Sequence, residues 1–156
     1  MKSIPFCLRW IGIFAAVVVL LAIGAPYGAA QQLPVVRLTA GMHVIRAEVA
    51  ANFDSRGRGL MFRESLEPNL GMVFVFDAME THCMWMRNTL IPLSVAFIAA
   101  DGIIVNIEDM KPKDDSTHCA KRPVPFALEM DRGWFAARGI KPGQRIGGLE
   151  KASKPQ

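Results

Sequence analysis

Hydrophobic and polar positions change their pattern at about residue 30 of this chain. Residues 10–23 form one apolar run, whereas the remainder alternates short apolar segments with polar turns. Residues 43–49 alternate apolar and polar side chains with a period of two, which is typical of a half-buried strand. The pattern predicts short strands over residues 35–38, 42–49, 72–76, 83–86, 93–99, 103–107, 126–130 and 145–149.

Two short helices are predicted between these strands. The first covers residues 53–62, where Asn52 or Asp54 can cap the helix N-terminus with a side-chain oxygen. The second covers residues 132–138, with Asp131 as its capping residue. Gly57 and Gly59 weaken the first helix by about 1 kcal/mol each.

Glycine-containing turns separate the predicted elements. Asp101 and Gly102 form a strong hairpin signal between two strands, and Gly139 stands where a C-terminal helix cap belongs. Many short strands with two short helices predict an α+β domain that is β-rich and mostly antiparallel. A compact barrel or two packed sheets would leave few exposed strand edges.

The first thirty residues have the three-part layout of a secretory signal peptide. Lys2 and Arg9 give a basic start, residues 10–23 an apolar middle, and small residues lead up to Ala30. The alternative is an uncleaved membrane anchor, which needs about 20 apolar residues. We expect cleavage after Ala30, a periplasmic or secreted protein without a stable membrane anchor, one domain over residues 31–150, and a disordered tail at 151–156.

Composition and charge narrow the class of protein. The chain has 156 residues, of which 51% are hydrophobic and 21% charged, and this excludes disordered and collagen-like chains. Its formal charge of +4 falls to +2 once Lys2 and Arg9 leave with the leader. The remaining charge is small, so we expect no nucleic-acid partner.

Cys83 and Cys119 remain after the leader, with its Cys7, is removed. Two cysteines in an oxidising compartment predict one disulfide. They are 36 residues apart in the sequence. Closing a loop of that length stabilises a domain by roughly 3–4 kcal/mol.

Three segments in this order and spacing resemble one known family. They are residues 56–63 (RGRGLMFR), residues 84–93 (MWMRNTLIPL), and residues 128–129 followed by 139–143 (GIKPG). The chain is similar over about residues 42–149 to the family called domain of unknown function 192. The resemblance implies a compact β-rich domain, often exported in bacteria and archaea, and it implies no established activity.

Two positions depart from the pattern of that family. Ser94 and Gln144 each stand where the family commonly has Asp. If the acid at position 94 takes part in chemistry elsewhere in the family, this chain lacks it.

Residues 85–89 offer a candidate ligand-binding site. Trp85 has a large aromatic surface with one N–H donor, and Asn88 and Thr89 add short polar side chains. With Arg58 nearby, these residues would suit a sugar or peptidoglycan fragment. The alternative is a core tryptophan beside a turn that Asn88 and Thr89 tie down through backbone hydrogen bonds.

Three arginines precede this stretch. On a helix Arg56 and Arg63 would share a face, and Arg58 would lie away from them. These arginines could bind a phosphate or carboxylate group through charge-assisted hydrogen bonds. The alternative is a solvated face, or a salt bridge to Glu64 or Glu67.

Two His-Cys pairs, at residues 82–83 and 118–119, raise the question of a soft metal. Imidazole and thiolate suit zinc or copper. However, adjacent residues on a strand point to opposite faces, so the two pairs cannot easily converge. A disulfide with core packing explains the same residues, and we expect no metal and no cofactor.

Catalytic motifs are lacking from the sequence. It has no G-x-S-x-G, H-E-x-x-H or P-loop. Cys83 with His43 or His118 could act as a thiol hydrolase, and an acid near Asp109 is a further possibility, but a disulfide would remove the thiolate. We therefore predict no catalytic residue. The expected function is binding of an envelope glycan, small molecule or partner protein; the alternatives are an envelope hydrolase and a copper- or zinc-binding protein.

Overall fold

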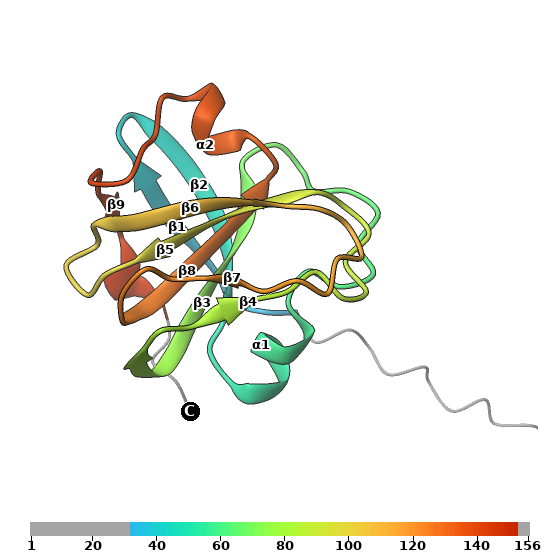
Figure 1. Cartoon of the computed structure of the whole chain (residues 1–156). Helices are drawn as coiled ribbons and strands as arrows, with labels where there is room; N and C mark the ends of the chain where they lie inside the picture. The colour runs from blue at the N-terminus through green and yellow to red at the C-terminus, as the bar shows by residue number, and fades with distance from the viewer. Residues whose placement is uncertain (1–31, 153–156) are drawn as a thin grey trace, which may run out of the picture. The chain divides into compact units, whose positions relative to one another are not determined.

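The computed structural model describes residues 32–152 of the chain (Figure 1). The predicted signal peptide and its cleavage site lie outside these residues, as do the last four residues of the predicted disordered tail. Lys151, the first residue of that tail, belongs to a short 3-10 turn. Within residues 32–152, no helix has both the length and the apolar character needed to cross a membrane.

A seven-stranded sheet forms the framework, in the order β6-β5-β8-β3-β2-β1-β9, and a second sheet pairs β4 with β7. The strands of the large sheet are β1 (Val35–Ala40), β2 (His43–Ala50), β3 (Leu70–Glu80), β5 (Leu93–Ile98), β6 (Ile104–Met110), β8 (Val124–Asp131) and β9 (Ile146–Gly147). The small sheet consists of β4 (Cys83–Met84) and β7 (His118–Cys119). The helices are α1 (Phe53–Arg58), α2 (Trp134–Ala137) and the 3-10 turn η1 (Leu149–Lys151).

The large sheet curls into a half-barrel (Figure 1). Its paired strands are antiparallel except for β2 and β3, which run parallel and are joined through α1. The predicted α+β fold, β-rich and mostly antiparallel, is confirmed. The parallel pair was not predicted, because a crossover between two strands leaves no periodic signal in the sequence.

The inner strands of the sheet are buried on both faces. Along β3, Met72 and Phe74 face one apolar cluster, whereas Val73 and Val75 face the other. All six residues of β5 are buried. A strand covered on both faces has a nearly continuous apolar sequence, and this explains the apolar run at residues 72–76.

Asn52 caps α1 through its side chain. Its Oδ1 accepts the Ser55 backbone N–H at 2.8 Å, and the Ser55 hydroxyl accepts the Asn52 N–H at 3.1 Å. The helix ends at Arg58 because Gly59 has φ +48°, a left-handed conformation that does not continue an α-helix. The predicted helix over residues 53–62 was therefore four residues too long.

The predicted cap of the second helix is wrong. α2 begins after Gly133, which has φ +79°. Because this N-cap residue is a glycine, it has no side chain that could cap the helix. Ser94, on β5, instead accepts the Gly133 N–H at 2.9 Å. Ser94 thus holds the N-cap residue from a distant strand, and neither Asp131 nor another side chain caps α2 among residues 32–152.

Several predicted boundaries also moved. The strand predicted over 72–76 extends from Leu70 to Glu80, and the one predicted over 83–86 contains two residues. The region 111–125 was expected to be a loop, yet it contains β7. These differences arise because strand length depends on the partner strand, and within residues 32–152 β4 and β7 pair only with each other.

Candidate functional site

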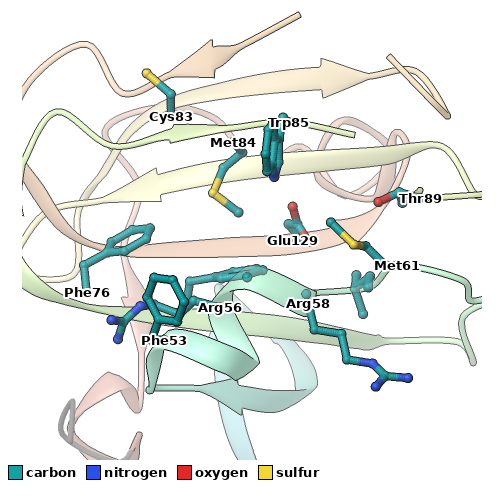
Figure 2. A pocket seen from close by; sticks show the side chains of 14 residues that line it. Phe53, Arg56, Arg58, Met61, Phe76, Cys83, Met84, Trp85, Thr89 and Glu129 are labelled. Carbon is teal, nitrogen blue, oxygen red and sulfur yellow. The ribbon is translucent and has the colours of Figure 1, made fainter. Parts of the chain in front are cut away.

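A pocket of about 260 Å³ opens on one face of the large sheet, between the α1 region and β4 (Figure 2). Most of its wall is apolar, with aromatic and methionine side chains. The lining residues are Phe53, Arg56, Gly57, Arg58, Gly59, Leu60, Met61, Phe74, Phe76, Cys83, Met84, Trp85, Thr89 and Glu129. A concave, mostly apolar site with a few polar groups is the usual form of a small-molecule site.

Glu129 supplies a buried carboxyl group to this pocket. It lies on β8 between Met72 of β3 and Val95 of β5, and only 3% of its surface is exposed. Within residues 32–152, no side-chain hydrogen bond to this carboxyl is formed, and burial raises its pKa to about 8. Since each pKa unit is a factor of ten, roughly nine in ten molecules hold the proton at pH 7.

Thr89 adds a second buried polar group. Its backbone is fixed in a turn, because its N–H donates to the Met86 carbonyl and its carbonyl accepts the Lys113 N–H, each at 3.0 Å. The residue is 4% exposed. Its hydroxyl makes no hydrogen bond to another residue of the described chain, so this hydroxyl is available to a ligand.

Trp85 forms the wall opposite the helix. It is 46% exposed, and the Arg87 guanidinium lies 4.5 Å from the centre of its ring. Arg87 is itself held by Asp115, with Nε 2.9 Å from the carboxylate oxygen. In Figure 2 the ring edge that carries the indole nitrogen is turned toward Glu129.

The two arginines of α1 that line the pocket differ in their contacts. The Arg56 guanidinium pairs with Asp77 and donates to the carbonyls of Ala51 and Val75, at 2.9 and 3.0 Å. Arg58 is exposed, and Figure 2 shows its guanidinium turned away from Glu129. Arg56 is therefore committed to the fold, whereas no ion pair within residues 32–152 holds Arg58.

The structure brings together three of the four predicted ligand-binding residues. Arg58, Trp85 and Thr89 line one pocket. Asn88 does not line the pocket. This residue has φ +59°, and its carbonyl accepts the Phe62 N–H at 2.9 Å, so its role is to stabilise the turn. Glu129 was missed, although a single acid inside the apolar run of β8 is a signal that could have identified it.

The third arginine, Arg63, lies beyond the end of α1. It forms a two-bonded ion pair with Glu48, at 2.8 and 2.5 Å. Glu67, one of the two partners expected for these arginines, pairs with Arg46 instead. The expectation that Arg56 and Arg63 share a helix face is wrong, because the helix ends first.

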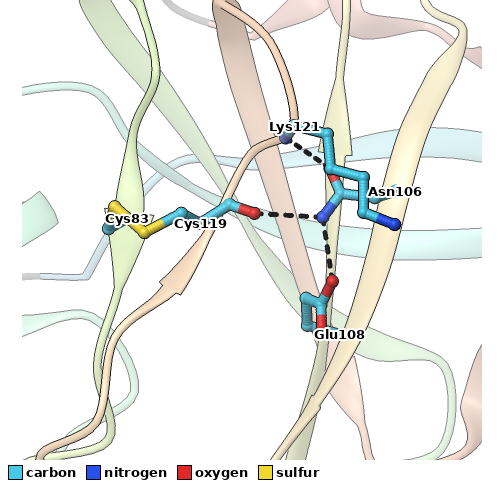
Figure 3. The surroundings of a disulfide bond; sticks show 5 residues. All are labelled: Cys83, Asn106, Glu108, Cys119 and Lys121. Carbon is cyan, nitrogen blue, oxygen red and sulfur yellow. Dashed lines mark hydrogen bonds between the residues drawn. A yellow bond between two sulfur atoms is a disulfide. The ribbon is translucent and has the colours of Figure 1, made fainter.

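A disulfide joins Cys83 and Cys119, with the sulfur atoms 2.02 Å apart. The two residues are direct partners across β4 and β7. Asn106 of β6 holds the segment of Cys119, since its Nδ2 donates to the Cys119 carbonyl and its Oδ1 accepts the Lys121 N–H (Figure 3). Cys83 therefore has no free thiol, and this contradicts the thiol-hydrolase alternative.

The histidines beside these cysteines do not form a metal site. His82 stacks on Phe76 with ring centres 3.7 Å apart, and its Nε2 lies 2.9 Å from the Ala78 carbonyl oxygen. His118 keeps Nε2 buried, with no hydrogen-bond partner in the part of the chain that the structure describes. Both sulfurs are in the disulfide, and no group of three potential ligands among His, Cys, Asp and Glu occurs within residues 32–152.

Ser94 and Gln144, the two residues that depart from the family pattern, both form hydrogen bonds that stabilise the fold. The Ser94 hydroxyl donates to Asp109 at 2.6 Å while accepting the Gly133 N–H. Gln144 accepts the Lys141 N–H at 2.8 Å and closes a turn. Ser94 and Asp109 line a different hollow from the one above Glu129.

Comparisons with known proteins agree on the type of domain. The pattern of DUF192, an uncharacterized ACR family, matches residues 36–148. A protein of unknown function from Novosphingobium aromaticivorans DSM 12444 is 35% identical, with TM-score 0.73, over 76% of this chain and 89% of that one. A protein from Sinorhizobium meliloti 1021, described as a candidate transcription regulator, is also 35% identical, with TM-score 0.68, over 72% and 91%. No curated protein matches the sequence.

Proposed function

Because this chain belongs to the uncharacterized DUF192 family, we propose its function from the pocket itself. The domain is a non-catalytic binding domain that holds a small ligand, or a single side chain of a larger envelope component, above Glu129. The ligand lies against Trp85, with Arg58 at the rim. The apolar part of the ligand contacts the aromatic and methionine side chains of the wall, and its polar end forms hydrogen bonds with Glu129 and Thr89.

One observation carries this proposal. The Glu129 carboxyl and the Thr89 hydroxyl line an apolar pocket, and neither has a hydrogen-bond partner among residues 32–152. Both groups open into the pocket; the sealed side-chain polar atom without a partner among residues 32–152 is His118 Nε2 instead. A ligand that bonds to Glu129 and Thr89 would therefore use hydrogen-bonding capacity that residues 32–152 leave unused.

The same residues favour binding over catalysis. A thiol mechanism needs a thiolate, and Cys83 is in a disulfide. A glycosidase commonly uses two carboxyl groups, and Glu129 is the one acid among the residues that line the pocket. A hydrolase would therefore need groups that this pocket does not contain.

The proposed setting is the cell envelope. It rests on the leader-like residues 1–30 and on the disulfide, which persists in an oxidising compartment. The description of the Sinorhizobium protein points to regulation of transcription. The charge of this chain after residue 30 is only +2, which gives little attraction for nucleic acid.

Proton–nitrogen NMR of the full chain tests the proposal. Titration with glycan fragments, short peptides and small amines should shift the signals of Thr89, Glu129 and the Trp85 indole N–H together. Trp85→Ala should weaken the response at least tenfold. Val44→Ala is the matched control, since Val44 is 47% exposed and does not line the pocket. If no probe moves these signals, or if Trp85→Ala binds as well as the wild type, the pocket is not the binding site.

A further inference from the structure

The pocket contains an acid, Glu129, that forms no ion pair with any residue from 32 to 152. Of its lining residues, Arg56 and Arg58 carry the positive charges. Arg56 is bound to Asp77 and to two backbone carbonyls, and Arg58 is turned away from Glu129. Burial accounts for the raised pKa of Glu129, with no contribution from a neighbouring charge.

The strands beside Glu129 also bring no charge to it. Its neighbours across the sheet are Met72 and Val95, both fully buried and apolar. β4 contributes Met84 and the disulfide-bonded Cys83 to the pocket wall. The arginines of α1 are thus the charged groups nearest to this acid among the residues lining the pocket.

The walls around the acid suit a cation with an alkyl chain. Trp85, Phe53 and Phe76 contribute aromatic rings, and Met61 and Met84 contribute thioethers. An aromatic face attracts an ammonium group within about 6 Å of the ring centre; Phe53 can offer one, whereas Arg87 covers one face of Trp85 and His82 stacks on Phe76. Methionine side chains adapt to an aliphatic chain. Apolar walls also strengthen an ion pair, because they lower the local dielectric constant.

We infer that the pocket binds an aliphatic ammonium group, with Glu129 as its counter-ion and Thr89 as a second hydrogen-bond acceptor. The inference rests on the proposed function, because it takes the pocket to be the ligand site. Free amines and the aminoalkyl side chain of a peptide share this chemistry.

Binding should then release a proton. The free pocket holds the Glu129 proton at pH 7, whereas an ammonium ion favours the carboxylate. Affinity should rise about tenfold from pH 6 to pH 7 and level off above pH 8, where the free carboxyl is already ionised. A neutral or anionic ligand bound by the protonated acid would instead bind almost equally at pH 6 and pH 7 and lose affinity above pH 8.

Calorimetric titration of the full chain distinguishes these cases. The ammonium probes are n-butylamine, as a free amine, and Nα-acetyl-lysine amide, as a peptide side chain. Their neutral counterparts are n-butanol and Nα,Nε-diacetyl-lysine amide, and butyrate is the anionic probe. We expect each ammonium probe to bind at least tenfold more tightly than its neutral counterpart. Buffers of different ionisation enthalpy should report close to one proton released at pH 7.

Glu129→Gln keeps the shape of the side chain and removes its charge. This variant should lose at least tenfold in ammonium affinity and all proton release, while n-butanol binds as before. Glu64→Gln, a change of an exposed acid outside the pocket, should behave as the wild type. If n-butanol or butyrate binds as tightly as n-butylamine, the ammonium inference is wrong while the pocket remains the binding site. If none of the probes and no member of the NMR panel binds, the proposed function fails as well.

Discussion

Replacing Glu129 with Gln should make the domain more stable at neutral and alkaline pH, by an amount that grows as the pH rises. In the folded protein, burial raises the pKa of this carboxyl from 4.5 to about 8. A raised pKa in an acid means that folding favours the protonated form. The favourable contribution is complete below the unfolded pKa and is lost as the pH rises through the folded pKa.

The magnitude follows from the number of bound protons. Between pH 4.5 and 8 the folded state holds one proton more than the unfolded state at this site, so the free energy of unfolding falls by about 1.4 kcal/mol per pH unit. That amounts to roughly 3 kcal/mol lost by pH 7 and roughly 5 kcal/mol above pH 8. Gln does not titrate, so the free energy of unfolding of the Gln variant does not fall with pH at this site.

Urea unfolding of both proteins from pH 4 to pH 9, with the disulfide intact, measures the effect. Subtracting the two free energies removes the contributions of other groups, such as Asp114, whose pKa is lowered by hydrogen bonds from Ser116. The difference should be flat below about pH 4.5, climb to pH 8 and then level off. A difference that stays constant from pH 5 to pH 8 would show that Glu129 keeps an ordinary pKa and that burial does not disfavour its carboxylate.

Three further perturbations test the packing around the site. Opening the disulfide by Cys83→Ser together with Cys119→Ser should cost about 3–4 kcal/mol of unfolding free energy in denaturant titrations, because the unfolded chain gains the entropy of the closed loop. Arg63→Ala should cost about 1–2 kcal/mol by the same assay, since it leaves the part-buried Glu48 carboxylate without its two hydrogen bonds. Phe97→Ala, at a fully buried site in the sheet, should cost about 3–5 kcal/mol and lower the melting temperature.

Matched controls separate these effects from general sensitivity to mutation. Arg46→Ala removes an ion pair whose partners are 55% and 68% exposed, and it should cost less than about 1 kcal/mol. Met42→Ala, at a residue that is 88% exposed, should change stability by no more than about 0.5 kcal/mol. An Arg63→Ala variant no less stable than Arg46→Ala would contradict the role given to the Glu48 pair.

Local signals in the sequence were enough to predict most elements. The Asp101–Gly102 turn joins β5 to β6 as expected, because a turn of this type needs a residue that tolerates positive φ, and Gly102 has φ +84°. Asn52 caps α1 through a contact three residues away. Such features depend on near neighbours in the chain, and the sequence contains those neighbours.

Contacts between distant segments determined the rest. The sequence indicated that Trp85 and Thr89 could form a site, but it did not show that Glu129 lies beside them, because β8 reaches that position through the pairing of the whole sheet. It likewise could not separate Arg58, which is left at the rim, from Arg56, which the carboxylate of Asp77 holds. The sequence by itself determined where strands and turns form, since propensity and periodicity are local. Only the tertiary structure decided which side chains face the pocket and which acid is buried there without a counter-ion, because burial depends on every segment that packs around a residue.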